Sequence, residues 1–184
     1  TAEDDSQDAI IYMATDQPDI HVTRGEFKTA VSHTAHALTQ LGIHPGDLVI
    51  IAHTQNLESI YLFWGSLAAG AVPSMFPTLT EKLDPAIYMA NMAELVRFSH
   101  VRAILTTDKF APQLAEQVAC PVYASNQLIV NSDQFVVDPH LQFTIHNSQL
   151  TIGDEIALLQ HSSGTTGLQK GVALSHTAVL NQIA

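Results

Sequence analysis

DLVIIAH, at residues 47–53, contains five consecutive apolar residues, which suits a single strand buried on both faces of a sheet. The next segment, NLESIYLFWGSLAAG (56–70), has helical length and ends on a glycine, a common helix stop. It leads into a second strand, AVPSMF (71–76), where Pro73 favours the edge of a sheet or a bulge. Because strands joined through helices usually lie parallel, this stretch predicts an α/β fold with a doubly wound, mostly parallel sheet and flanking helices.

The alternation of helices and strands continues towards the C-terminus. A helix over 84–100 begins on an aspartate N-cap, and the apolar segment VRAILTT (101–107) follows it as a strand. A further helix from Pro112 and a short strand over 121–125 complete the pattern, so residues 47–124 are expected to form one parallel sheet. The four strands are expected to centre near Val49, Val72, Ile104 and Val122.

The chain divides into three parts within one domain of residues 1–184. An amphipathic helix over 23–42 joins the sheet, so residues 22–125 form a βα sheet subdomain. Residues 126–153 alternate only weakly and are expected to form an irregular connection. Residues 154–184 hold a strand, a glycine-rich loop and the start of a helix.

Composition excludes several classes of protein. Apolar residues make up 46% of the chain and charged residues 14%, which is not a disordered composition. The net charge of −11 argues against nucleic acid as a partner, so an anionic ligand has to be held by local groups. The segment 59–80 has no charge, but a glycine and two prolines interrupt it, which predicts a buried core helix and no membrane span. The single cysteine, Cys120, is expected to be a buried, inert thiol. Because the N-terminus has no signal-peptide pattern, a cytoplasmic protein is expected.

One loop, HSSGTTGLQKG (161–171), differs from the rest of the chain. Its glycines allow consecutive backbone N–H groups to face an anion, and its hydroxyl side chains and lysine add further donors. It is not a Walker motif, because Gln169 stands where that motif needs glycine, and Thr166 rules out the dinucleotide-binding G-x-G. A flexible Ser/Gly turn is the alternative. The predicted phosphate site consists of Ser162, Ser163, Gly164, Thr165, Thr166, Gly167 and Lys170.

The segment SSGTTGLQKGVALSH (162–176) resembles the signature loop of the adenylate-forming enzymes, which include acyl- and aryl-CoA synthetases, luciferases and the adenylation domains of peptide synthetases. Their loop typically reads Ser/Thr-Ser-Gly-Ser/Thr-Thr-Gly-x-Pro-Lys-Gly, and Gln169 here replaces the proline without removing a ligand. The segments VTRGEF…ALTQLGIHPGDLVII and GSLAAGAVPSMFP are similar to two earlier conserved segments of that family. The resemblance runs from about Val22 to the last residue.

The resemblance implies an ATP-dependent, AMP-forming ligase of the acyl-CoA synthetase type. In such enzymes a carboxylic acid attacks the α-phosphate of Mg·ATP to give acyl-AMP and pyrophosphate, and a thiol, from CoA or carrier-protein pantetheine, then displaces AMP. By carry-over, residues Ser162 to Gly167 hold the β- and γ-phosphates, Thr166 lies near the Mg²⁺-bound oxygens, and Lys170 accompanies the departing pyrophosphate.

The family's adenine, ribose and catalytic-lysine motifs lie further along its chains than the signature loop. The resemblance therefore implies an N-terminal fragment of a longer enzyme, with no certain catalytic residue of its own and no activity without its C-terminal part. An adenylation domain that loads a carrier protein and a non-catalytic nucleotide-binding α/β module are the alternatives. The residues do not identify the acyl substrate.

The remaining candidate residues favour structural roles. His33 and His36 have a metal-ligand spacing, but an exposed helix face explains them without a metal. His161 is expected to end a strand, with an approach to phosphates or to an acyl pocket as the alternative. The aromatic residues of 61–64 are expected to pack in the core, and the acidic pair at 154–155 to form a turn.

Overall fold

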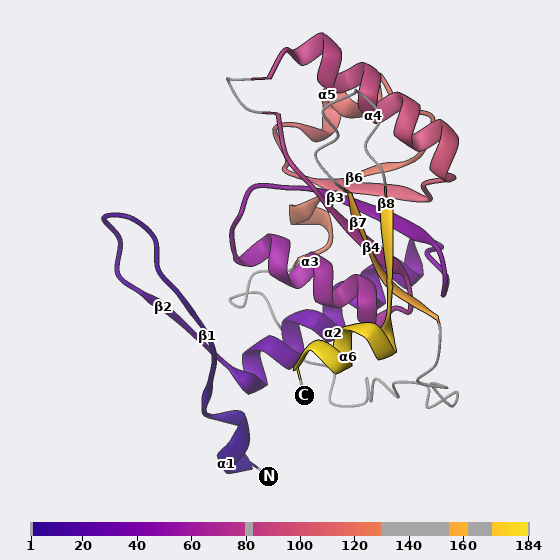
Figure 1. Ribbon diagram of the computed structural model, residues 1–184. Coiled ribbons are helices and arrows are strands. Elements are labelled where there is room, and N and C mark those ends of the chain that lie inside the picture. Colours follow the sequence, from indigo (N-terminus) through magenta and orange to yellow (C-terminus); the bar gives the residue numbers. More distant parts are fainter. Residues whose placement is uncertain (1, 80–82, 130–154, 162–170, 184) are drawn as a thin grey trace.

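A parallel sheet of four strands lies at the centre of the fold (Figure 1). The structure, a computed structural model, describes residues 2–79, 83–129, 155–161 and 171–183. The strands of the sheet are β3 (Leu48–Ala52), β4 (Val72–Phe76), β5 (Ala103–Thr106) and β6 (Val122–Ala124). Their order is β4-β3-β5-β6 and every neighbouring pair is parallel, which confirms the predicted sheet and its four strand positions. The proline-containing strand β4 lies at an edge of this sheet, as its sequence predicted.

Helices cover both faces of the central sheet. The helices are α2 (Arg24–Gln40) and α3 (Leu57–Ala68) on one face, and α4 (Pro85–Ser99) and α5 (Ala111–Ala115) on the other. Successive residues of β3 point to opposite faces. Val49 and Ile51 pack with Leu62 of α3 in one buried cluster, whereas Ile50 packs with Met92 of α4 in the other. Burial on both faces explains the continuous apolar run, and the doubly wound α/β prediction is confirmed.

Polar side chains define where the three long helices begin. Thr23 and Glu26 form a capping box at the start of α2, in which each side chain accepts a hydrogen bond from the other residue's backbone N–H. Asp84 caps α4 by accepting hydrogen bonds from the backbone at its first turn, as predicted. Asn56 caps α3 in the same way. These local signals are why the helix starts can be predicted from the sequence.

The packing of α2 against α3 requires a glycine. A Cβ atom placed on Gly65 would lie 2.4 Å from Cγ2 of Thr34, well inside van der Waals contact. Thr34 is completely buried. The two helices therefore approach as closely as they do because position 65 has no side chain.

The prediction that the aromatic residues of α3 pack in the core is wrong for Trp64. Trp64 is 48% exposed, and its ring makes edge-to-face contacts with Phe27 and Phe63. Leu62, two positions earlier, is completely buried. Two positions on a helix correspond to more than half a turn, so Trp64 lies on the outer side of α3.

An N-terminal hairpin that was not predicted projects from the body of the molecule (Figure 1). Its strands, β1 (Asp8–Tyr12) and β2 (Ile20–Thr23), are antiparallel and follow the short helix α1 (Ala2–Asp5). The Tyr12 hydroxyl donates a 3.3 Å hydrogen bond to the carbonyl of Gln55, which attaches the hairpin to the turn after β3. Most positions of these two strands, taken together, are exposed, whereas the strands of the central sheet are recognisable in the sequence because their residues are buried.

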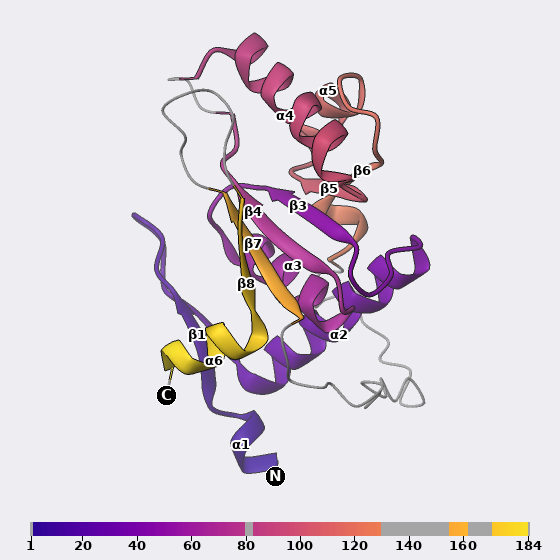
Figure 2. The same ribbon diagram turned by 45° about the vertical axis from the view of Figure 1, so that its right-hand side comes forward.

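A second antiparallel hairpin lies beside the edge of the central sheet (Figures 1 and 2). It consists of β7 (Ile156–His161) and β8 (Gly171–Ser175), and helix α6 (His176–Ile183) follows it. Strand β7 runs alongside β4 but remains part of a separate two-stranded sheet. The predicted strands on both sides of the loop, and the helix after them, are confirmed.

Two further predictions are partly tested. The connection predicted to be irregular (126–153) overlaps at its start with a short 3₁₀ turn, η1 (Ser125–Gln127), and its residues 130–153 lie outside the described residues. Cys120 is half-buried, and burial raises the pKa of its thiol to about 11, so the thiol stays protonated at neutral pH.

Within the described ranges, no helix has the length and apolar character needed to cross a membrane.

Candidate functional site

The hairpin β7–β8 carries the predicted phosphate loop. His161, the last residue of β7, is the cross-strand partner of Gly171, the first residue of β8. The hairpin pairing therefore brings the two ends of the loop together. The seven predicted phosphate-site residues all lie outside the described residues: Ser162, Ser163, Gly164, Thr165, Thr166, Gly167 and Lys170. The structure describes the paired strands β7 and β8, which flank the loop in the sequence.

His161 is held by two residues of β4. Its Nδ1 atom lies 2.8 Å from Oγ of Ser74, a hydrogen-bond distance, and Ser74 is completely buried. The ring of Phe76 meets the imidazole edge-on, with 5.8 Å between the ring centroids. Burial lowers the pKa of His161, so the imidazole is neutral at pH 7. The expectation that His161 ends a strand is confirmed, while Ser74 and Phe76 were not among the predicted site residues.

An aromatic row supports this end of β4. The rings of Phe76 and Tyr88 are 6.1 Å apart, and Tyr88 in turn lies 5.7 Å from Phe110. The Tyr88 hydroxyl donates a 2.8 Å hydrogen bond to the carbonyl of Pro77, and burial raises its pKa well above the ordinary tyrosine value. Helix α4 thus secures the carboxyl end of β4, where His161 docks.

The position of the hairpin suits ligand binding. In open α/β sheets, ligands bind beyond the carboxyl ends of the parallel strands. Ser74 is the middle residue of β4 and Phe76 its last, so His161 docks on the carboxyl half of that strand. His161 directly precedes the hydroxyl- and glycine-rich segment 162–170 in the sequence.

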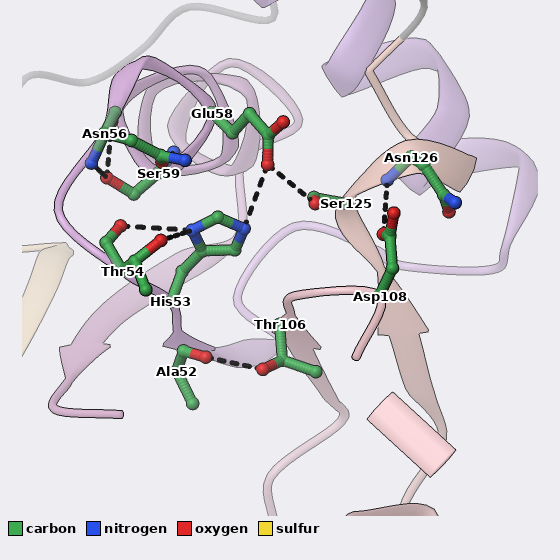
Figure 3. A network of polar contacts seen from close by, with 10 residues as sticks. All are labelled: Ala52, His53, Thr54, Asn56, Glu58, Ser59, Thr106, Asp108, Ser125 and Asn126. Carbon is green, nitrogen blue, oxygen red and sulfur yellow. Dashed lines mark hydrogen bonds and ion pairs between the residues drawn. The ribbon is translucent and has the colours of Figure 1, made fainter. Parts of the chain in front are cut away.

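A second polar cluster lies at the carboxyl ends of β3, β5 and β6 (Figure 3). The side chain of His53 is completely buried, with Nδ1 3.1 Å from the carbonyl of Thr54 and Nε2 3.2 Å from Oε2 of Glu58. The same Glu58 oxygen accepts a 2.8 Å hydrogen bond from Ser125. None of these residues was a predicted site residue. The only sequence signal is a histidine directly after a fully apolar strand.

This cluster occupies the switch point of the sheet, where the helix after β3 and the helix after β5 lie on opposite faces. The chain's own groups bond one another there. Thr106 donates a 2.6 Å hydrogen bond to the carbonyl of Ala52, and Asp108 accepts one of 3.2 Å from the backbone of Asn126. Apart from Nε2 of His53, to which no hydrogen bond is made within the described residues, these polar groups bond one another, so the carboxyl half of β4 beside β7 is the better candidate for a ligand site.

An apolar cavity of about 420 Å³ lies on the other side of β4. Met75 faces it, whereas its neighbours Ser74 and Phe76 face His161, as the alternation of a strand requires. The lining residues are Phe63, Met75, Leu158, Leu159, Gln160, Leu174, Ala178, Val179 and Gln182. The lining has no charged group, so this cavity is unsuited to a phosphate.

Metal-ligating side chains are not clustered in the described part of the chain. No group of three or more histidine, cysteine, aspartate or glutamate side chains is placed there to hold an ion. His36 is exposed on α2, and the pKa of His33 is lowered first by burial and then by the charge of His36. Thr166, the residue expected near magnesium-bound oxygens, lies outside the described residues.

The doubly wound sheet, with an antiparallel hairpin that docks beside its edge strand β4, has the architecture of the adenylate-forming enzymes. The chain belongs to the AMP-binding enzyme family, whose model matches residues 2–184. The resemblance seen in the loop is thereby confirmed, and the family match also includes the N-terminal hairpin.

Relatives of two kinds are similar to this chain. A linear gramicidin synthase of Brevibacillus parabrevis is 30% identical over 170 residues, which are 89% of this chain and 2% of the synthase. 4-Coumarate–CoA ligase 3 of Arabidopsis thaliana is 26% identical over 172 residues, which are 88% of this chain and 28% of the ligase. The chain thus spans less than a third of the length of either relative.

Among solved structures, a fatty acyl-adenylate ligase from L. pneumophila, crystallised with acyl adenylate and pyrophosphate, matches with a TM-score of 0.74. The sequence identity is 20%, and the match covers 99% of this chain and 30% of the ligase. At this identity the match supports the shared fold. It agrees with a partial N-terminal domain of an adenylate-forming enzyme.

Proposed function

We propose that this chain is the loop-bearing part of an ATP-dependent, AMP-forming acyl-CoA synthetase. The observation that supports the proposal is the position of the hairpin: His161 and Gly171, the residues on either side of 162–170, are cross-strand partners, and His161 docks on the carboxyl half of β4. The proposal retains the division into a sheet subdomain (22–125), a connection (126–153) and a loop-bearing part (154–184).

In the proposed reaction, a carboxylate attacks the α-phosphorus of ATP, an acyl-AMP forms and pyrophosphate leaves. The backbone N–H groups and hydroxyl side chains of Ser162 to Gly167 hold the β- and γ-phosphates. Lys170 neutralises charge that develops on the departing pyrophosphate. In the second step the thiol of CoA attacks the acyl carbonyl and AMP leaves.

Magnesium fits this proposal through the nucleotide. Mg²⁺ is usually held by one or two protein oxygens together with substrate phosphates and water, so it does not need a cage of protein ligands. The Thr166 hydroxyl is the proposed protein group near the metal. This is compatible with a described part of the chain that contains no cluster of three ligating side chains.

The binding part of the proposal can be tested on this chain. We expect Mg·ATP and inorganic pyrophosphate to bind to it in calorimetric titrations, and the Lys170→Ala variant to bind pyrophosphate more weakly. Lys170→Arg is the matched control, because it keeps the positive charge. If wild-type and Lys170→Ala protein bind pyrophosphate equally, the phosphate role of this lysine is wrong.

The catalytic part needs the complete enzyme. We expect ATP–pyrophosphate exchange with a panel of fatty and aryl acids in the full-length protein, and none from residues 1–184 alone, because the remaining motifs of the family are required. Robust exchange by this chain alone would overturn the view that it is incomplete.

A carrier-protein acceptor is the second candidate, favoured by the 30% identity to a gramicidin synthase. The two candidates differ only in the second step. Transfer of the acyl group from acyl-AMP to free CoA supports the synthetase, whereas transfer only to a pantetheinylated carrier protein supports the adenylation domain.

A further inference from the structure

The hairpin β7–β8 is docked on β4 without a shared backbone ladder. The central sheet has four strands and the hairpin forms a separate sheet of two strands, although β7 runs alongside β4. In a continuous sheet, the ladder of backbone hydrogen bonds sets the register between neighbouring strands. Here the position of β7 along β4 has to be set by side chains.

The Ser74–His161 contact is suited to this task. Ser74 is completely buried in β4, and its hydroxyl lies 2.8 Å from Nδ1 of His161. The two residues are 87 positions apart in the chain, so the contact joins the sheet to the far end of β7. A buried hydroxyl that loses its partner is costly, so the pair favours one position of the hairpin over its neighbours.

The contact with Ser74 uses one of the two nitrogens of the imidazole. A serine hydroxyl donates or accepts, so the contact forms with either tautomer of a neutral imidazole. Nδ1 is occupied by Ser74, and Phe76 supports the ring from the same strand at 5.8 Å. The polar contact between His161 and the sheet is therefore made by Nδ1.

We infer that His161 is a positioning residue, which through its Nδ1 contact with Ser74 sets where the hairpin β7–β8 sits on the edge of the central sheet. It acts through the hairpin and requires no contact with a ligand. The consequence for nucleotide affinity rests on the proposed function, since the same hairpin carries residues 162–170. The effect of His161 on the position of the hairpin does not depend on the proposed function.

Four variants distinguish the polar contact between Nδ1 and Ser74 from the packing of the ring against Phe76. Ser74→Ala removes the partner, His161→Phe keeps a ring against Phe76 but loses the polar contact, and His161→Asn keeps a polar group near the Nδ1 position. His161→Gln carries the same amide one bond further out and so misses Ser74. Gln160→Ala, at an exposed position of β7, is the control for a substitution in the hairpin that leaves the pair intact.

Native-state amide hydrogen exchange of β7 and β8 provides a readout that needs no nucleotide. We expect Ser74→Ala and His161→Phe each to accelerate exchange of these amides by about 2- to 10-fold, the effect of losing one hydrogen bond. His161→Asn should retain more protection than His161→Gln. The double variant Ser74→Ala/His161→Phe should exchange no faster than either single variant, because both remove the same contact.

The nucleotide readout is the dissociation constant for Mg·ATP and for inorganic pyrophosphate. We expect it to rise in Ser74→Ala and His161→Phe by a similar factor and to recover in His161→Asn. If no variant, wild type included, binds either probe, the proposed function fails for this chain, and amide exchange still decides the inference. Additive effects of Ser74→Ala and His161→Phe on exchange, or unchanged protection in Ser74→Ala, would overturn it.

Discussion

Nε2 of the buried His53 side chain lies 3.2 Å from Oε2 of Glu58, and the same oxygen accepts a 2.8 Å hydrogen bond from Ser125. One carboxylate thus joins the end of β3, the first turn of α3 and the 3₁₀ turn after β6 (Figure 3). The distance to Nε2 suits an ion pair, while no hydrogen bond reaches this atom within the described part of the chain. Glu58 is half exposed, so its charge is partly screened by water.

Removing this carboxylate should destabilise the carboxyl edge of the sheet. We expect Glu58→Ala to lower the free energy of unfolding by about 1–3 kcal/mol, because the buried hydroxyl of Ser125 loses its acceptor. Glu58→Gln keeps an oxygen acceptor and should cost less than about 1 kcal/mol, the usual value of a partly exposed ion pair. Urea denaturation measures both, with the exposed Glu116→Ala as control. Equal losses in the two Glu58 variants would assign the effect to the ion pair instead.

The Gly65 contact should not tolerate a methyl group. Gly65→Ala places a Cβ atom 2.4 Å from Cγ2 of Thr34, and overpacking of this kind costs about 1–3 kcal/mol. Thermal or urea unfolding measures the loss. Thr34→Gly should lower the free energy of unfolding less in the Gly65→Ala background than in the wild type, because the substitution removes the side-chain atoms that clash with the new Cβ atom at position 65. Independent effects of the two substitutions would contradict the close approach of α2 and α3.

The stability supplied by His161 should depend on pH. Burial lowers its pKa below the ordinary histidine value of 6.5, so the folded state disfavours the protonated imidazole. The stability of the wild type relative to His161→Asn should therefore be greatest above pH 6.5 and decrease as pH falls from there through the folded-state pKa. Urea denaturation of both proteins at a series of pH values on either side of 6.5 measures the difference. A difference that grows on acidification would show that the imidazole is docked as a cation.

Lys170 should affect only one half-reaction of the complete enzyme. A lysine beside departing pyrophosphate stabilises charge mainly in the transition state, so Lys170→Ala should slow adenylation by about 10- to 1,000-fold. Thiol transfer from pre-formed acyl-AMP should be nearly unchanged, because no pyrophosphate is present. Timing the two half-reactions separately tests this. An equal loss in both would make Lys170 a structural residue and remove the best support for the phosphate loop.

Much of the fold follows from local patterns in the sequence. A strand with both faces buried must be apolar throughout, so DLVIIAH predicted β3 and its parallel neighbours without any structure. The Asp84 cap was predictable because the capping groups lie within one helical turn. The loop residues 162–170 stand out for a similar reason, since small residues next to a lysine are a local property.

Tertiary structure alone decided which of these elements meet. Ser74 and His161 are 87 positions apart, and nothing near either residue in the sequence indicates that they pair. The burial of His53 and the exposure of Trp64 likewise depend on neighbours from other elements. A local pattern reports which face of an element is apolar, whereas the partner that covers this face is selected by the packing of the whole chain. The sequence therefore determined the strands of the central sheet and of the hairpin β7–β8, the starts of the long helices and the composition of the loop. The tertiary structure determined the order of the sheet, the N-terminal hairpin and the docking of β7–β8 on β4.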